Sequence, residues 1–121
     1  MLIKELNVKK DMPPADVAVA NLEIEIEALT NTEYGLIKVI HGYGSHGKGG
    51  EIRSQVRERL KQLKKSKKIL DYIEGEKFGR QAIDKFDIVK NFPQLILQND
   101  IKNYNNGITL VILTNFSKSL A

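Results

Sequence analysis

Hydrophobic and polar positions alternate along the chain in blocks that predict four strands. The stretch IKELNVKK at 3–10 has mixed β character, and a Pro-Pro pair that cannot continue a strand ladder soon follows it. GLIKVIHG at 35–42 holds four aliphatic residues interrupted only by Lys38, as in a short buried strand. ILDYIEGEKFG at 69–79 predicts a third strand that ends at a glycine. ITLVILTN at 108–115 is rich in β-branched residues and is the clearest strand of the chain.

Two longer blocks have helical spacing. In residues 15–31 the positions Leu22, Ile24 and Ile26 alternate as in a strand. A second set in the same block recurs at helical spacing instead: Val19, Leu22, Ile26 and Leu29. The length of the block, its Ala and Glu content and the prolines before it favour a helix. A second amphipathic helix is predicted over about 51–68, from apolar positions at steps of four, four and three: Ile52, Val56, Leu60 and Leu63.

Residues 80–106 have a less regular pattern. NFPQLILQNDI at 91–101 predicts a short helix with Asn91 as its cap and Pro93 in its first turn, and YNNG at 104–107 predicts a turn. The element order is then β-α-β-α-β-(insertion)-β. This order predicts an α/β two-layer sandwich with a four-stranded mixed sheet and right-handed crossovers.

Composition limits the class of protein. A chain of 121 residues fits one domain over 1–121, and 41% hydrophobic with 28% charged residues is typical of globular proteins. The first residues lack the apolar region of a signal peptide, and no run is long enough to span a membrane. The chain contains no cysteine, which excludes disulfides and thiolate zinc sites. We therefore expect a cytoplasmic protein with no membrane partner.

Charge is concentrated in one segment. Residues 48–68 hold nine basic and two acidic residues, a net charge of +7, whereas the whole chain has a net charge of +4. The rest of the chain is therefore net −3. A basic run often forms only the solvated face of a helix, but this asymmetry favours a polyanionic partner.

A glycine-rich segment directly precedes the basic helix. Residues 42–50 contain five glycines, and 41–53 hold both histidines of the chain. The segment lies between a predicted strand and a predicted helix, where ligands bind in open α/β sheets. Backbone N–H groups and the helix dipole at such a point attract anions, so we expect a phosphate-binding segment.

One candidate anion is a mononucleotide. The spacing from Gly42 to Gly47 and Lys48 matches a Walker A loop. However, Gly49 stands where a Ser or Thr would hold magnesium, and no later strand ends in a metal-binding aspartate.

The second candidate is nucleic acid, and here the chain resembles a family. VIHGYGSHGKGGEIRSQV resembles the second motif of the Smr (small MutS-related) domain, a strand, an HG-x-G and a helix that opens with an arginine. The family's last motif resembles GITLVIL, at Gly107, Thr109, Val111 and Leu113. The order of elements agrees over nearly the whole chain. The family fold resembles the C-terminal domain of translation initiation factor 3, and its members bind DNA or RNA, several of them as nicking or ribonucleolytic endonucleases.

The resemblance places His41, Gly42 and Gly44 in the HG-x-G motif and Arg53 at the helix opening. The chain departs from the family at its first strand. Asn7 and Lys9 stand where the family has an Asp and a His that are proposed for catalysis. Residues 80–106 are also an insertion relative to the family pattern. A flap over the substrate, a partner-binding element and plain decoration are the alternatives, and we favour decoration.

Candidate site residues in 41–65 follow from the predicted phosphate-binding segment with its basic helix and from the family resemblance. His41 is the candidate general acid or base, and the basic side chains would contact phosphate. The full set of predicted phosphate or nucleic-acid contacts is Gly42, Tyr43, Gly44, His46, Gly47, Lys48, Gly49, Gly50, Arg53, Arg57, Lys61, Lys64 and Lys65. Two histidines in a glycine-rich segment without a carboxylate cluster do not make a metal site, and we expect no cofactor.

Three hypotheses of function therefore remain. The first is a structure-selective nicking endonuclease that acts on DNA or RNA, with His41 in proton transfer. The second is a nucleic-acid-binding or recruitment module without cleavage, because Asn7 cannot act as a carboxylate base and Lys9 poorly replaces an imidazole. The third is a nucleotide binder with a degenerate phosphate loop.

Overall fold

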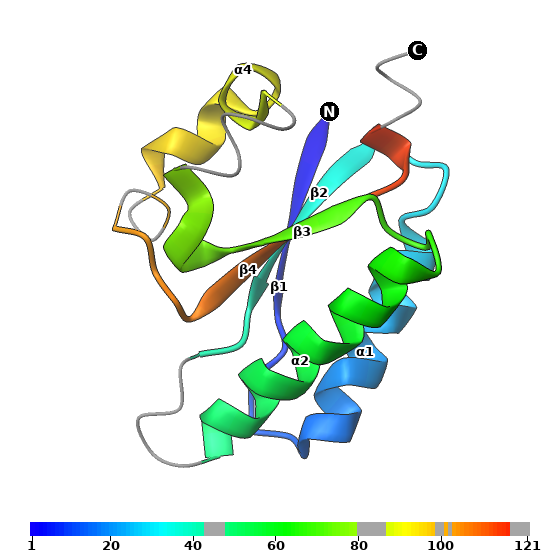
Figure 1. The fold of residues 1–121 in the computed structure, drawn as a ribbon, viewed down its shortest axis with the longest axis vertical. Helices are drawn as coiled ribbons and strands as arrows, with labels where there is room; N and C mark the ends of the chain where they lie inside the picture. Colours follow the sequence, from blue (N-terminus) through cyan, green and yellow to red (C-terminus); the bar gives the residue numbers. More distant parts are fainter. Residues whose placement is uncertain (43–47, 80–86, 99–100, 102, 117–121) are drawn as a thin grey trace.

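The computed structural model of the protein describes residues 1–42, 48–79, 87–98, 101 and 103–116. Four strands form one open sheet, two long helices cover one face of it, and shorter helical turns cover the other (Figure 1). The elements are β1 (Leu2–Asn7), α1 (Ala15–Ala28), β2 (Tyr34–Ile40), α2 (Lys48–Lys65), β3 (Asp71–Glu74), the 3-10 turn η1 (Gly75–Lys77), α4 (Ile88–Asn91), the 3-10 segment η2 (Pro93–Leu97) and β4 (Ile108–Ile112). The predicted α/β class and element order are confirmed.

The sheet is mixed, with strand order β1-β2-β4-β3. β1 and β2 are parallel, as the first β-α-β unit requires, and Asn7 pairs with Ile40 at their carboxyl ends. β4 inserts between β2 and β3 and is antiparallel to both. The last strand in the chain is therefore a central strand of the sheet, and all five of its residues are buried.

The helix face of the sheet holds the first core. α2 buries the predicted positions Ile52, Val56, Leu60 and Leu63. α1 buries Ala18, Leu22 and Ile26 beside them, so the helical stripe prevails over the alternating one in 15–31. Burial of aliphatic side chains of this size contributes roughly 1.5–3 kcal/mol each. The two helices lie side by side on this face (Figure 1).

The opposite face of the sheet holds a second core, supplied by the excursion, which we define as residues 75–107. Its described apolar residues pack against Leu36, Leu110 and Ile112 of the sheet: Phe78, Ile88, Phe92, Leu95 and Ile101. The ring of Phe92 stacks on that of Phe116 at a centroid distance of 5.8 Å. The interpretation of 80–106 as decoration is wrong, because its described part provides this core.

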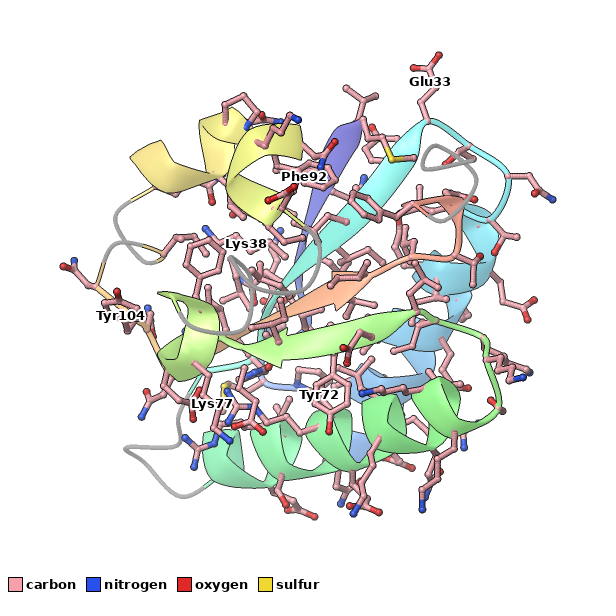
Figure 2. The ribbon with its side chains drawn as sticks, turned by 45° about the horizontal axis from the view of Figure 1, so that its top comes forward. Glu33, Lys38, Tyr72, Lys77, Phe92 and Tyr104 are labelled. Atoms are coloured by element: carbon pink, nitrogen blue, oxygen red, sulfur yellow. The ribbon has the colours of Figure 1, made fainter. Side chains whose placement is uncertain are left out.

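A polar contact also ties the excursion to the sheet. Lys38, in the middle of β2, is buried on the excursion side and its Nζ donates to the Gln98 side chain at 2.9 Å (Figure 2). A buried ammonium group requires such partners, since burial without hydrogen bonds costs several kcal/mol. The lysine that interrupts the aliphatic run of this predicted strand thus has a structural role.

The boundaries of some elements differ from the prediction. Asn91 is the last residue of α4 and its side chain donates to the Asp87 carbonyl, so it caps no following helix. Pro93 instead opens the 3-10 segment η2, because a residue before proline is disfavoured in helical conformation. β3 ends at Glu74 rather than Gly79, because η1 begins at the next residue, Gly75. α2 begins at Lys48 and ends at Lys65, three residues earlier than predicted at each end.

Candidate functional site

The candidate site lies where the carboxyl ends of β1 and β2 meet the start of α2. The Val8 amide donates to the Ile40 carbonyl at 3.0 Å, which extends the parallel pairing past both strands. Gly42 has a φ of +73°, and a Cβ there would lie 3.2 Å from Cδ of Lys9. The two regions that the Smr resemblance compares, Asn7–Lys9 and His41–Gly42, are therefore adjacent. Asn7 itself accepts the Lys9 backbone N–H through Oδ1 at 3.1 Å.

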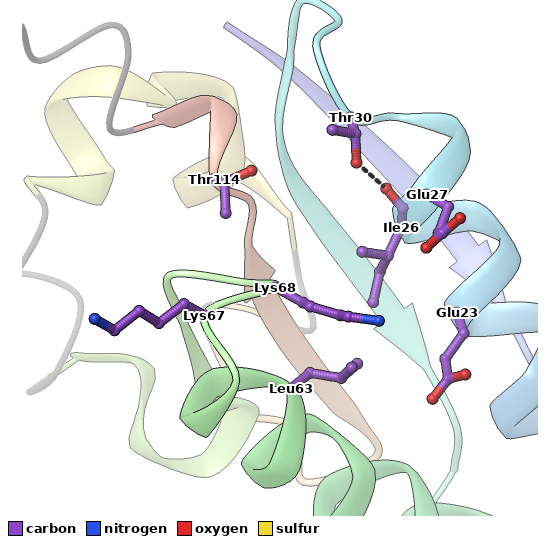
Figure 3. A pocket seen from close by; sticks show the side chains of 8 residues that line it. All are labelled: Glu23, Ile26, Glu27, Thr30, Leu63, Lys67, Lys68 and Thr114. Carbon is purple, nitrogen blue, oxygen red and sulfur yellow. Dashed lines mark hydrogen bonds between the residues drawn. The ribbon is translucent and has the colours of Figure 1, made fainter.

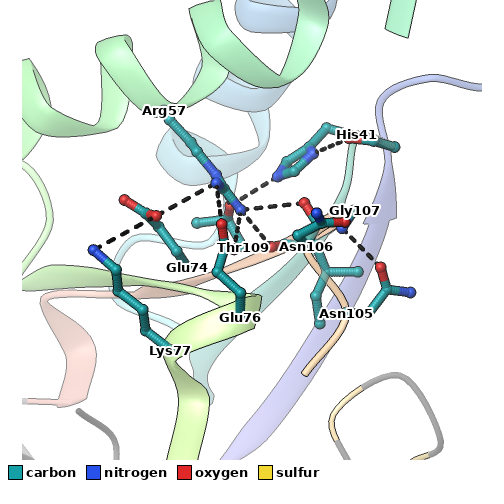
Figure 4. Close-up of polar contacts among 11 residues, drawn as sticks. His41, Arg57, Glu74, Glu76, Lys77, Asn105, Asn106, Gly107 and Thr109 are labelled. Atoms are coloured by element: carbon teal, nitrogen blue, oxygen red, sulfur yellow. Dashed lines mark hydrogen bonds and ion pairs between the residues drawn. The ribbon is translucent and has the colours of Figure 1, made fainter. Parts of the chain in front are cut away.

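His41 is fully buried at this point, and both of its ring nitrogens have partners (Figure 4). Nδ1 lies 2.7 Å from the Gly42 carbonyl oxygen, and Nε2 lies 2.8 Å from Oγ1 of Thr109. The same Oγ1 accepts from Nε of Arg57 at 3.0 Å. Since the guanidinium can only donate, the Thr109 hydroxyl proton is left for Nε2, and Nδ1–H donates to the carbonyl. The contact with the Gly42 carbonyl thus places a proton on Nδ1, and Nε2 of the neutral imidazole accepts from the Thr109 hydroxyl.

Burial, which has the largest effect, and the positive charges of Arg57 and Arg53 together lower the pKa of His41 to about 4. The hydrogen bond to the Gly42 carbonyl acts in the opposite direction. The imidazole is consequently neutral at pH 7 and holds no proton on Nε2. A general acid needs that proton, and a general base needs the Nε2 lone pair that the Thr109 hydroxyl occupies.

Arg57 is the hub of this network. Its side chain is 16% exposed, and it forms a bidentate pair with Glu76 at 3.0 and 2.7 Å. A longer contact of 3.4 Å reaches Glu74. The remaining N–H, on Nη2, is shared between the backbone carbonyls of Asn106 and Ile108, at 3.3 and 3.2 Å (Figure 4). All five guanidinium N–H groups thus have acceptors. Arg57 also holds the pKa of Glu76 below its usual value, against the opposing effect of burial.

The same contacts hold the two ends of the excursion together, and we call these ends, residues 75–76 and 105–107, the neck. Glu76 lies at the start of the excursion and Asn106 near its end, and Arg57 binds both. A Cβ on Gly75 would overlap the carbonyl oxygen of Asn105, so only glycine allows the two ends to come this close. The backbone N–H groups of His41 and Gly42 both donate to the Gly107 carbonyl, at 3.0 and 2.9 Å. The neck and the start of the glycine-rich segment are thereby one hydrogen-bonded unit.

The predicted phosphate ligands fall into three groups. Tyr43, Gly44, His46 and Gly47 lie outside the described residues, so their roles remain predictions. Lys48, Gly49 and Gly50 form the first turn of α2, and Arg53 is half-buried in the next turn. The predicted ligands farther along α2 are Arg57, Lys61, Lys64 and Lys65, which differ in their pairing.

Pairing with acids divides the basic residues of α2 and of the turn after it. Arg57 binds Glu74 and Glu76, Arg59 binds Glu23, and Lys64 lies 2.9 Å from Asp71. We call Arg57, Arg59 and Lys64 the paired set. Four exposed lysines form no ion pair with any described residue, and we call them the open set: Lys61, Lys65, Lys67 and Lys68.

Sequence reasoning missed three residues of the network. The last family motif contains Thr109 without giving it a role, and Glu74 and Glu76 lie in the predicted strand 69–79 without a predicted partner. The alternation of β3 and β4 carries a usable signal, because a Thr in an otherwise aliphatic central strand marks a buried polar partner. No sequence spacing connects Thr109 with Arg57, which is 52 positions away.

A separate hollow of about 290 Å³ lies at the other end of α2, about 27 Å along the helix axis from its start (Figure 3). Its floor is apolar, from Ile26 and Leu63. Acids of α1 and lysines of the turn after α2 stand around it, and the Lys68 side chain extends across it towards α1: its polar lining is Glu23, Glu27, Thr30, Lys67, Lys68 and Thr114. It contains none of the predicted site residues.

Metal binding and membrane insertion can be assessed for the described residues. In that part of the chain, no three His, Cys, Asp or Glu side chains are grouped to hold a metal ion. None of the helices described is both long and apolar enough to cross a bilayer.

These contacts bring the HG-x-G region and the terminal Gly-x-Thr strand together. No family model, curated protein or solved structure matches the chain. The Smr resemblance therefore remains a hypothesis that rests on the two motifs. The geometry adds that His41 and Gly42 of one motif form hydrogen bonds with Gly107 and Thr109 of the other.

Proposed function

We propose that the protein is a nucleic-acid-binding domain that contacts phosphates through the segment 42–50 and the lysines of the open set. The observation that carries this proposal is the open set itself. Four ammonium groups are exposed along one helix and the turn after it, and no described carboxylate pairs with any of them. Such lysines supply salt-dependent, sequence-independent affinity for a phosphate backbone.

The start of α2 supports the same partner. Its N–H groups lie beside the glycine-rich segment, and the helix dipole makes this end favourable for an anion. The peptide groups that lead into the segment are held in place by the Gly107 carbonyl. A phosphate contact at 42–50 and further contacts at Lys61 and Lys65 would follow one helix from its first turn to its last.

Binding without cleavage is better supported than endonuclease activity through His41. The neutral imidazole is buried, and both of its nitrogens are occupied by Thr109 and Gly42. Asn7 is not a carboxylate, and its Oδ1 already accepts the Lys9 N–H. We therefore assign His41 to positioning the start of the glycine-rich segment rather than to proton transfer.

The test measures binding and cleavage together. Fluorescein-labelled single-stranded and duplex DNA and RNA are titrated with protein at several salt concentrations, and supercoiled plasmid and end-labelled RNA are incubated for cleavage. We expect submillimolar binding that weakens steeply with salt, and intact substrates in all lanes. Cleavage by wild type that His41→Ala abolishes would replace this proposal with the endonuclease hypothesis.

A matched pair of variants locates the surface. Lys61→Gln with Lys65→Gln should flatten the slope of log K against log salt by about one to two units. Lys90→Gln, an exposed lysine of α4 on the other face of the sheet, should leave the slope unchanged. ATP serves as a competitor, because a nucleotide binder would bind it well and long polyanions only weakly. An unchanged slope in the double variant would reject the proposal.

A further inference from the structure

The outward face of α1 carries a line of apolar residues. Ile24 is 66% exposed and Val17 is 43% exposed, the largest such values among the aliphatic residues of the described helices. Ala20 and Ala28 are also exposed and lie at the same helical spacing, with steps of three, four and four. We call Val17, Ala20, Ile24 and Ala28 the outer stripe. It lies opposite the buried positions Ala18, Leu22 and Ile26 of the same helix.

A surface helix of a globular protein normally turns polar residues to solvent. α1 instead has an apolar stripe on both sides, and it lies at the margin of the molecule (Figure 1). Single exposed aliphatic residues are common, but a continuous line over three turns of helix marks an interaction surface. Branched side chains at 17 and 24 alternate with alanines at 20 and 28. This alternation gives ridges and holes into which a second helix can pack.

The charge around the outer stripe has one sign. α1 contains four acids and no basic residue: Asp16, Glu23, Glu25 and Glu27. Glu23 binds Arg59 and Glu25 lies 3.9 Å from Lys4. Asp16 and Glu27 form no ion pair with a described residue. The rim of the outer stripe therefore has a carboxylate without a described ion pair at each end of α1.

We infer that the outer stripe docks a basic amphipathic helix of another polypeptide, with aliphatic residues along one side and Lys or Arg flanking them. Aliphatic side chains would fill the positions above Ala20 and Ala28, and the flanking cations would reach Asp16 and Glu27. The helix α1 is about 21 Å long, so a partner of four turns covers it.

The other occupants fit less well. A second copy that offered its own α1 would bring four further carboxylates against these, with like-charge repulsion. A second copy that offered α2 would present charged and polar residues, which cannot cover an apolar line. An anionic membrane surface would be repelled by the acidic rim.

The test uses the full chain, labelled with 15N, and two designed 18-residue helical peptides. Both carry leucines at helical spacing, and lysines flank the leucines in one whereas glutamates flank them in the other. At 150 mM salt we expect the lysine peptide alone to bind and to shift amide resonances of residues 15–28. Ile24→Ser should weaken this binding at least about tenfold, which is typical of a central interface residue. Tyr104→Ser removes another exposed hydrophobic side chain, 53% exposed, on the excursion and should leave the binding unchanged.

Three results would overturn the inference. The lysine peptide could fail to shift residues 15–28, or the glutamate peptide could bind equally well. Alternatively, sedimentation could show a wild-type dimer that Ile24→Ser converts to a monomer, which would make a second copy the occupant. Ile24→Ser should not alter nucleic-acid affinity, so these results are distinguishable from a failure of the proposed function.

Discussion

Two sets of basic residues share α2 and the turn after it but have different surroundings. The paired set flanks the buried stripe of the helix and meets acids of α1, β3 and η1. The open set is exposed and forms no ion pair with a described acid. The difference teaches that position around the helix, rather than the number of charges in the segment, decides which cations are available to a polyanion. Part of the positive charge of residues 48–68 is neutralised by ion pairs with acids of the same chain.

The largest expected effect comes from acidification, which disrupts the contacts that link His41 through Thr109 to Arg57 of the paired set. The pKa of His41 is about 4 in the folded protein, below its ordinary value of 6.5, so the unfolded chain binds more protons between these values. The contribution to stability is complete above pH 6.5 and is lost as the pH falls towards 4. We expect a loss on the order of 3 kcal/mol across this window, measured by urea unfolding at each pH.

Glu76 has a lowered pKa, so its contribution to stability is lost only at still lower pH, below the ordinary pKa of a glutamate.

The control for the His41 prediction is His46→Ala, which leaves His41 as the sole histidine and should keep the pH dependence. In this variant the remaining imidazole should show the Nδ1–H tautomer and no titration above pH 5 by NMR. A titration near pH 6.5 would contradict the burial and the contacts of His41.

Arg57→Met should reduce the free energy of unfolding by about 2.5 kcal/mol. The change leaves Glu76 without its partner and removes donors from the carbonyls at the neck of the excursion, while the methionine keeps most of the apolar volume. Urea unfolding measures the loss. Lys61→Met, on the open set, should change stability by less than about 0.5 kcal/mol. Equal effects of the two variants would show that the paired and open sets do not differ.

Thr109→Val should cost about 1.5 kcal/mol, because Nε2 of His41 and Nε–H of Arg57 lose their shared partner inside the protein. Thr109→Ser keeps the hydroxyl and is the matched control. Chemical denaturation of both variants gives the difference. If serine were as destabilising as valine, the methyl group rather than the hydrogen bonds would account for the effect.

The smallest effect on stability is expected for Lys61→Gln combined with Lys65→Gln. These side chains form no ion pair with a described acid, so the free energy of unfolding should change by no more than about 0.5 kcal/mol. The same double variant should lose affinity for nucleic acid at low salt, as measured by fluorescence anisotropy. A clear loss of stability would mean that the open set has a structural role as well.

Most of the fold could be predicted because local patterns determine it. The spacing of Ile52, Val56, Leu60 and Leu63 required a helix, and the β-branched run at 108–112 required a strand. The insertion of β4 between β2 and β3 depends on contacts between distant residues, which periodicity does not encode. The second core was missed for the same reason, since Phe78, Phe92 and Ile101 have no regular spacing and meet only through the sheet.

The site was predictable in place but not in chemistry. The strand-to-helix junction indicated His41, Gly42 and the start of α2, and these do lie together with the 107–109 region. Charge alone suggested that Arg57 was available for phosphate, whereas Glu76 and Thr109 occupy its donors. These partners come from other strands and turns, so their approach to Arg57 is a tertiary property. The contacts predicted for Tyr43 and His46 stay predictions.

The central place of β4 has a consequence for how the protein is made. β3 pairs only with β4 among the described strands, and β2 needs β4 on its second side. During synthesis, residues 1–107 emerge first, and until residue 112 has followed, the edges of β2 and β3 that pair with β4 have no partner strand. Open strand edges can pair with one another in neighbouring nascent chains, so we expect this interval to be the time when the protein most depends on chaperones.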